Sequence, residues 1–140
     1  MLMNVSCLSL RFYFLTLTLI LPAASYSAET LVRNAAESAS AVSGAAPGDV
    51  VVLADGTYES QGFHLHGRGT AEAPVLFRPE TPGASILTGL SAITISGSHV
   101  VVDGLVFDQA WEGTAVRFEG ATECRLTNTA FIECGRPTST

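Results

Sequence analysis

Short apolar runs, most of them rich in β-branched residues, recur along the chain and are separated by polar residues and glycine. Runs of this kind are typical of strands with at least one buried face. Most are followed within two or three residues by Gly56, Gly89, Gly97, Gly104, Gly120 or Asn128, residues that tolerate the left-handed backbone of a tight corner. The runs cover residues 50–53, 75–77, 85–87, 92–95, 100–102, 105–107, 116–118 and 125–126. The pattern predicts an all-β fold with sharp corners.

The apolar runs also repeat at a nearly fixed interval. Residues 102–107 align with 126–131 at an offset of 24, residues 51–53 align with 75–77 at the same offset, and the step from Val75 to Val100 is 25. A period in the twenties without intervening helices indicates a solenoid. We therefore predict a right-handed parallel β-helix of about four coils. A β-sandwich is the alternative, but it would need hairpin turns and strict alternation instead of continuous valine runs.

One helix is expected, near the start of this domain. Residues 34–43 are alanine-rich and Gly44 follows them. Asn34 suits the N-cap position, and Glu37 lies three residues on, an arrangement close to a capping box. We predict a short N-terminal capping helix over residues 34–43.

The first residues have the order of a secretory signal peptide. Arg11 precedes an apolar run over residues 12–21, and small residues suitable for cleavage after Ser25 or Ser27 follow. The run is too short to cross a bilayer, which requires about 20 apolar residues. We predict a signal peptide over residues 1–27, a secreted or periplasmic protein and no stable membrane anchor. An uncleaved anchor is the alternative, and Cys7 is expected to leave with the signal.

The second predicted segment, residues 28–140, is one part of a β-helix domain. A solenoid needs a capping element over its last coil, and no such element is evident before Thr140. The sequence therefore predicts an N-terminal portion of a longer β-helix, with a reading frame that continues beyond Thr140.

The charged residues narrow the possible functions. The 140 residues include 13 acidic and seven basic residues, all seven of them arginine, for a net charge of −6. This balance disfavours a nucleic-acid partner, which requires a basic surface. The absence of lysine excludes a lysine base or a Schiff-base nucleophile on this stretch of chain.

Two histidines and one arginine near the middle of the chain are candidates for binding. His64 and His66 share one face of a strand, opposite Phe63 and Leu65, which is the spacing of a partial metal site. Without an identifiable third ligand, a solvated outer face is the favoured interpretation. Arg68 stands between two glycines, but no helix follows that would complete an anion-binding loop, so a turn is favoured.

The remaining candidates lie in the second half of the chain. The acidic series is compatible with calcium ligation, but solvated turns explain it as well; its members are Asp103, Asp108, Glu112, Glu119 and Glu123. Trp111 lies in a predicted loop, either stacked on a sugar ring or packed as an anchor. Cys124 and Cys134 suit either a disulfide, which export permits, or two buried thiols; with no histidine near them in sequence, a catalytic thiol is disfavoured.

The succession of short motifs resembles the N-terminal part of the family 6 polysaccharide lyases, the alginate lyase and chondroitinase-B-like group. The resemblance covers roughly residues 30–140, and no single piece of it is specific. The matching pieces are Pro47-Gly48-Asp49, Leu53-Ala54-Asp55-Gly56-Thr57-Tyr58, Gly67-Arg68-Gly69-Thr70-Ala71 with Pro74, Thr81-Pro82-Gly83, Leu87-Thr88-Gly89, Ile95-Ser96-Gly97-Ser98, Gly104-Leu105-Val106-Phe107 and Cys124-Arg125-Leu126-Thr127-Asn128.

The resemblance implies calcium-assisted β-elimination on a uronate-containing polysaccharide, with alginate as the expected substrate. In this group a lysine is the base and an arginine assists it, while acidic and amide side chains hold calcium, all in later coils. Since the chain has no lysine and no matching Asn/Glu cluster, we predict no catalytic residue and no metal site on it, and an inactive fragment of an active lyase. Nothing assigns the helper role to Arg117, Arg125 or Arg136, and substrate-binding residues stay unknown.

Two other functions are compatible with the same pattern. The first is a non-catalytic β-helix module that binds glycan or a surface partner, and the weaker second is a pectate-lyase-like or glycosidase-like β-helix enzyme. For the lyase we expect an acidic polysaccharide as partner and a monomeric state.

Overall fold

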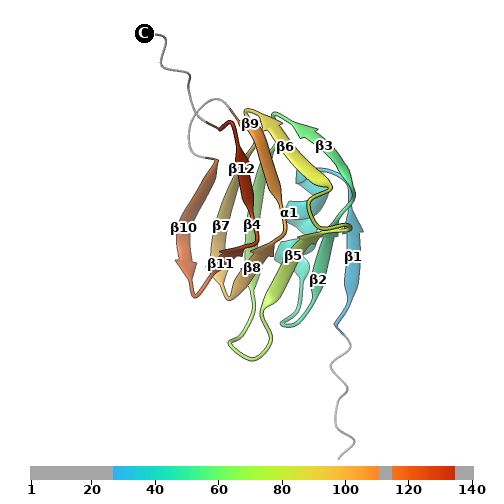
Figure 1. Cartoon of the computed structure of the whole chain (residues 1–140). Coiled ribbons are helices and arrows are strands. Elements are labelled where there is room, and N and C mark those ends of the chain that lie inside the picture. Colours follow the sequence, from blue (N-terminus) through green and yellow to red (C-terminus); the bar gives the residue numbers. More distant parts are fainter. Residues whose placement is uncertain (1–26, 111–114, 135–140) are drawn as a thin grey trace, which may run out of the picture.

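The computed structural model describes residues 27–110 and 115–134, which wind into a parallel β-helix with three sheets and one helix (Figure 1). Residues 1–26, with the predicted signal and Cys7, lie outside the described part, as do Trp111, Glu112 and Arg136. Sheet A has the strand order β1 (Glu29–Val32), β2 (Val50–Leu53), β5 (Val75–Pro79), β8 (Val100–Asp103) and β11 (Arg125–Thr127).

The other two sheets complete each coil. Sheet B has the order β12 (Ala130–Ile132), β9 (Val106–Ala110), β6 (Ser85–Gly89) and β3 (Gly56–Glu59). Sheet C has the order β10 (Val116–Thr122), β7 (Ala92–Ser98) and β4 (Gly62–Arg68). From β2 onward the chain adds one strand to sheets A, B and C in turn, and every described strand pairing is parallel. The predicted parallel β-helix is confirmed, and the hairpins that a β-sandwich requires do not occur among the described strands.

The strand registers confirm two of the three predicted offsets. Leu126 pairs with Val102 and Phe131 with Phe107, an offset of 24, and Val75 pairs with Val100, an offset of 25. The third offset was wrong: Val51 pairs with Phe77, so β2 and β5 are offset by 26 and not by 24. The observed offset of 26 and the predicted offset of 24 differ by two residues. Because side chains alternate between the two faces of a strand, both offsets place the same side chains on the inner face. The apolar pattern therefore fixed the face but not the register.

Two strands were not predicted at all. Strand β1 has one buried residue, Val32, and β3 has one, Tyr58. Neither gives the continuous apolar run on which the prediction relied. Both pair along their full length with a strand of the next coil, β2 and β6 respectively. Backbone pairing to a neighbouring coil, rather than apolar content, makes these segments strands.

The core is a set of inward-facing rows that run from coil to coil. Val51, Phe77 and Val102 form the row of sheet A, and each is at most 1% exposed. In sheet B the rings of Phe107 and Phe131 stack with centroids 5.0 Å apart. Burial of such rows between successive coils supplies the apolar contact that a single coil lacks.

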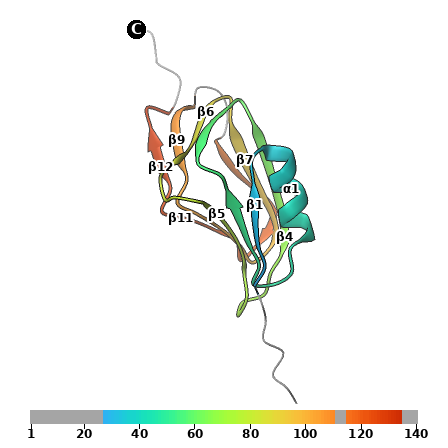
Figure 2. The same cartoon turned by 90° about the vertical axis from the view of Figure 1, so that its right-hand side faces the viewer.

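Helix α1 (Ala35–Gly44) begins as predicted and covers the first strand of sheet C (Figure 2). Asn34 accepts a hydrogen bond from the Glu37 backbone N–H at 2.8 Å, and Glu37 in turn accepts one from Arg33 N–H at 2.7 Å. Val42 is fully buried and lies 3.3 Å from the position that a Cβ on Gly67 would take. The helix therefore occupies the place of a missing strand beside β4 and shields the first coil.

Four of the six predicted corners form at or between strand ends, but Gly97 lies within β7 and Gly120 lies within β10, where the pairing with β7 shifts register. Gly56, Gly89, Gly97, Gly104, Gly120 and Asn128 all have positive φ angles, between 47° and 152°. Gly97 is the tightest of these positions, since a Cβ there would overlap the carbonyl oxygen of its partner Gly67 in the coil before. Only a residue without a side chain fits this close approach.

The two cysteines are not bonded to each other, and the alternative of two buried thiols is also wrong, because Cys124 is only half-buried and Cys134 is exposed. Each thiol instead donates to main-chain oxygens: Cys124 Sγ lies 3.5 Å from Thr122 O, and Cys134 Sγ lies 3.4 Å from Ile132 O. Among the described residues, no helix is long and apolar enough to cross a membrane.

Candidate functional site

The outer surface of sheet C is a polar array built from three successive coils. Strand β4 alternates between buried and exposed residues, so Phe63 and Leu65 point inward while His64, His66 and Arg68 point outward. The solvated outer face predicted for the two histidines is confirmed. Parallel pairing then aligns these three residues with residues of β7 and β10. We call this surface the sheet C face; its members are His64, His66, Arg68, Thr94, Ser96, Ser98, Arg117, Glu119 and Thr122.

Strand register brings residues distant in sequence into common rows on this face. His64 pairs with Thr94, and Arg117 pairs with the same Thr94 from the other side. In the next row, His66 pairs with Ser96, and the His66 Nδ1 atom lies 3.0 Å from the Ser96 hydroxyl oxygen. The rows therefore present imidazole, hydroxyl and guanidinium groups side by side. Such groups donate hydrogen bonds to carboxylates and sugar hydroxyls.

The described residues do not form a metal centre. No group of three or more His, Cys, Asp or Glu residues lies close enough together in them to hold an ion. The predicted lack of a metal site and of a catalytic residue on the whole chain stays a prediction.

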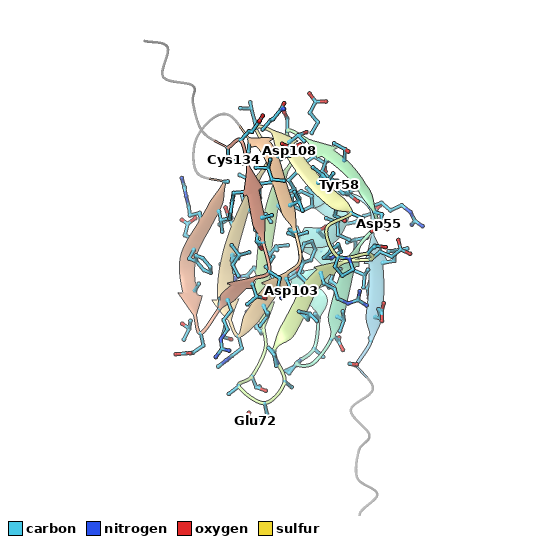
Figure 3. The ribbon with its side chains drawn as sticks, in the orientation of Figure 1. Asp55, Tyr58, Glu72, Asp103, Asp108 and Cys134 are labelled. Carbon is cyan, nitrogen blue, oxygen red and sulfur yellow. The ribbon has the colours of Figure 1, made fainter. Side chains whose placement is uncertain are left out.

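The acidic series that the sequence singled out is dispersed over the fold. Asp103 is the last residue of β8, while Asp108 lies on the outer face of β9, well apart from it (Figure 3). Glu119 lies on β10, and Glu123 at the corner before β11. Asp103 is already hydrogen-bonded through its Oδ1, which accepts from Thr127 Oγ1 at 2.7 Å and from Asn128 Nδ2 at 2.6 Å. This carboxylate therefore ties the corner of one coil to the next.

A small pocket lies at the corner between sheets C and A. Its volume is about 160 Å³, and its lining residues are Ala71, Pro74, His99, Val101, Glu123 and Arg125. His99 and Glu123 both adopt left-handed backbone conformations, with φ near 50°, at equivalent corners of successive coils. The pocket thus combines one imidazole, one carboxylate and one guanidinium. Arg125 and Glu123 were candidates from the sequence, whereas His99 was not, because its position beside them depends on coil length.

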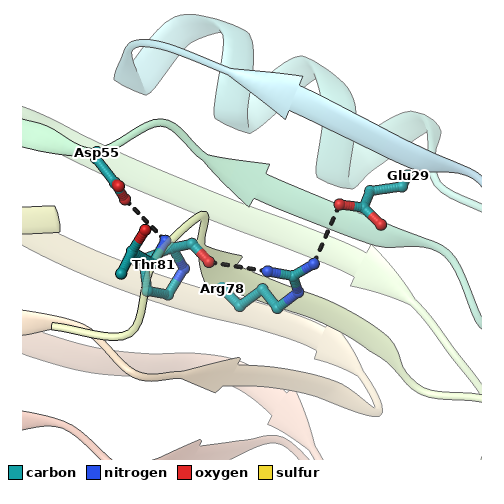
Figure 4. A network of polar contacts seen from close by, with 5 residues as sticks. Glu29, Asp55, Arg78 and Thr81 are labelled. Carbon is teal, nitrogen blue, oxygen red and sulfur yellow. Dashed lines mark hydrogen bonds and ion pairs between the residues drawn. The ribbon is translucent and has the colours of Figure 1, made fainter. Parts of the chain in front are cut away.

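The Arg78–Glu29 ion pair is a structural contact on sheet A. Arg78 Nη2 lies 3.1 Å from Glu29 Oε1, and Arg78 Nη1 donates to Pro79 O at 3.0 Å (Figure 4). The pair spans from β5 to β1 across β2, whose outward-facing Val52 is only 2% exposed. Both charged groups are partly exposed, so the pair contributes less than about 1 kcal/mol by charge alone.

Tyr58 occupies a buried position near the first corner. Its hydroxyl donates to Ala54 O at 2.6 Å. Burial, followed by the negative charges of Asp55 and Glu37, raises the pKa of Tyr58, while Arg33 acts in the opposite direction. The hydrogen bond from the Tyr58 hydroxyl ties the buried side chain to the main chain at this corner.

The described residues therefore offer two surfaces with groups that can bind a ligand. The sheet C face and the corner pocket offer donors to an anionic or hydroxylated ligand. No lysine is present anywhere in the sequence, and the acidic groups are dispersed.

Comparisons with known proteins give one matching protein family and several solved structures with a similar fold. A protein-family model described as chondroitinase B matches residues 32–137. One similar solved structure is that of the family 6 alginate lyase AlyGC, which is 31% identical in sequence. The match covers 74% of this chain and 15% of the AlyGC chain, with a TM-score of 0.69. No match was found among curated protein sequences.

Two further solved structures are similar. A mannuronic-acid-specific family 6 polysaccharide lyase from human gut microbiota is 27% identical, with 80% of this chain and 28% of that chain covered and a TM-score of 0.70. A family 6 polysaccharide lyase from Pseudopedobacter saltans is 25% identical, with coverages of 73% and 24% and a TM-score of 0.68. The chain thus spans less than a third of the length of these structures.

Proposed function

The chain belongs to the chondroitinase B family, and from that premise we propose that it contributes β-helix coils to a lyase that cleaves an acidic polysaccharide by β-elimination. The observation that carries the proposal is the family match over residues 32–137, joined to 31% identity with an alginate lyase over 74% of the chain. A shared fold alone would not support an activity. Sequence identity to lyases across most of the chain supports one.

Alginate is the substrate that we propose. Support comes from the names of similar structures, since one is an alginate lyase and another is specific for mannuronic acid. Uronate carboxylates require positively charged or hydrogen-bond-donating partners. The sheet C face supplies groups of both kinds.

Calcium is the cofactor that we propose for the lyase. It binds through several oxygen ligands, and the described residues bring no such set of carboxylates together. The residues that the structure describes do not fit the ion, so no step of the reaction is assigned to it on them. No base is assigned either, because lysine is absent from the sequence.

Export is a further proposal. The order of charge, apolar run and small residues over positions 1–27 supports a cleaved signal peptide and a secreted or periplasmic location. Acidic polysaccharides are too large to enter a cell intact, so such a location fits the proposed substrate.

A non-catalytic glycan-binding module is the second candidate function. The dispersed acidic groups and the polar sheet C face favour it, because both are compatible with binding in the absence of cleavage.

Activity measurements distinguish the two candidates. The product of the complete reading frame is incubated with alginate and with a neutral polysaccharide, and ultraviolet absorbance from unsaturated sugar ends is followed. We expect a rise with alginate only, and its loss when a chelator removes calcium. The 140-residue chain is the matched control and should give no rise, since it has no lysine base. No cleavage of any uronate polymer by the complete product would leave the binding module as the better account.

A further inference from the structure

We propose that strand β1 is a dimerisation edge, at which two copies of this chain pair antiparallel about a two-fold axis at Leu31. The pairing joins the A sheets of the two copies into one continuous sheet. The inference goes beyond the proposed lyase activity and does not depend on it, because it rests on the backbone, the charges and the apolar groove at the first strand.

Strand β1 has one side that no described strand pairs with. It ends the strand order of sheet A, and its partner on the other side is β2. The carbonyl oxygens of Ala28 and Val32 point to β2 and its end, and each accepts a backbone hydrogen bond of 2.8 Å there. Because alternate residues of a strand direct their backbone groups to opposite sides, Glu29 and Leu31 direct theirs away from β2. Such unpaired groups are a template for another strand.

An apolar groove lies beside this edge, between β1 and α1 (Figure 2). Its volume is about 480 Å³, and its apolar lining consists of Leu31, Val32, Ala36 and Ala41. Leu31 is 43% exposed and is one of five exposed large hydrophobic residues in the described part of the chain. A second copy that pairs with β1 brings its own strand and helix over the groove and removes Leu31 from water.

The charges near the ends of β1 favour a second copy as the occupant. In an antiparallel pair centred on Leu31, Glu29 lies opposite Arg33 of the second copy, and the reverse pair forms by symmetry. The two Leu31 residues then exchange both of their backbone hydrogen bonds, and two opposite-charge pairs flank them. Arg78 contacts Oε1 of Glu29, which leaves Oε2 for the second copy, and no described ion pair involves Arg33. The edge is therefore complementary to itself.

Strand β1 also lacks the residues that commonly protect an edge. Lysine and proline often prevent edge strands from pairing, and β1 contains neither. The strands of the last described coil, β10, β11 and β12, lie at the opposite edges of their sheets. Pairing through β1 therefore leaves those edges accessible.

Sedimentation velocity of the 140-residue chain tests the dimer. Measured from about 1 to about 100 μM, the chain should show a reversible monomer–dimer equilibrium. Glu29→Arg and Arg33→Glu each place like charges opposite one another, and each should weaken association by about tenfold or more. The double variant Glu29→Arg/Arg33→Glu restores opposite charges and should return the dissociation constant to within about threefold of the original value.

Matched variants separate β1 from other surfaces. Arg117→Glu reverses the same charge as Arg33→Glu, but on β10 at the opposite edge of the molecule, and should leave association unchanged. Leu31→Lys places a charge at the two-fold axis and should weaken association by about tenfold or more. Because Leu31 is exposed, this variant should fold even if a charge reversal at Glu29 or Arg33 does not. Thermal unfolding of each variant checks the fold.

Hydrogen exchange locates the interface independently. The Leu31 amide should exchange several-fold more slowly in the concentrated sample than in the dilute one, because it gains a partner only in the dimer. The Thr30 amide lies on the β2 side of the strand and should exchange at the same rate in both samples.

A monomer at every concentration, the state expected from the sequence, would overturn the proposal. Equal losses in Arg33→Glu and Arg117→Glu would do the same, as would a double charge reversal that fails to recover association or a Leu31 amide that does not respond to concentration. None of these measurements uses a polysaccharide, so a complete gene product that cleaves no uronate polymer would refute the proposed lyase and leave the dimer to its own test.

Discussion

At the scale of single residues, glycine positions carry the most specific demands of the fold. Gly44 at the end of α1 has open space around it, Gly83 combines open space with a φ of +81°, and Gly97 combines a φ of +87° with contact to the Gly67 backbone. The three sites separate the cost of left-handed backbone from the cost of steric overlap.

Alanine substitution at these three positions should give a graded series. We expect Gly97→Ala to lower the free energy of unfolding by about 3 kcal/mol or more, because left-handed strain and overlap with backbone add. Gly83→Ala should cost about 1 kcal/mol through strain alone. Gly44→Ala should be neutral or stabilising by up to about 1 kcal/mol. Urea unfolding checks the order, and a Gly97→Ala loss no larger than that of Gly83→Ala would contradict the close approach.

At the scale of elements, α1 is the unit whose boundaries the sequence predicts best. Its N-cap is a local contact, because Asn34 Oδ1 accepts from Glu37 N–H three residues on. The backbone carbonyl of Asn34 also accepts from the Ser38 backbone N–H at 3.0 Å, a contact that no side-chain change at Asn34 removes. The side-chain contribution of the cap can therefore be measured separately.

Asn34→Ala should lower the free energy of unfolding by about 1 kcal/mol, since one helix N–H loses its partner. Asn34→Asp keeps an acceptor at the same place and should stay within a few tenths of a kcal/mol of the unmodified chain. Chemical denaturation of both variants makes the comparison. Equal losses for alanine and aspartate would show that the cap does not stabilise the helix.

At the scale of the whole molecule, burial is uneven from coil to coil. Phe77 lies in an inner row between neighbouring coils and is fully buried, whereas Phe131 on β12 is 51% exposed although it stacks on Phe107. In a solenoid, stability is approximately a sum of coil and interface contributions. The middle coils should therefore contribute most.

Substitution of one phenylalanine in each position tests this gradient with the same change in volume. Phe77→Ala should cost about 3–5 kcal/mol, the range for a buried phenylalanine. Phe131→Ala should cost less than about 2 kcal/mol, because half of its side chain is already in water. Thermal unfolding of the two variants provides the check, and similar losses would argue against a gradient of stability along the axis.

The sequence by itself determined the class of structure and the position of its corners. Alternation of side chains and the steric freedom of glycine are local properties, so the runs at 50–53 and 100–102, the corner at Gly104 and the cap at Asn34 could all be read from neighbouring residues. For the same reason the outward orientation of His64 and His66 was predictable from one strand.

Only the tertiary structure decided which residues meet across coils. Coil length is set by loops whose conformations leave no periodic signal. Gly62 and Ala92 pair at an offset of 30, while Ile93 and Val116 pair at 23. These lengths place Arg117 in the row of His64, set β2 and β5 two residues away from the predicted register, and separate the acidic residues. The apolar pattern constrains which face of a strand is buried, but pairing between coils depends on the complete path of the chain, and that path places every group of the sheet C face.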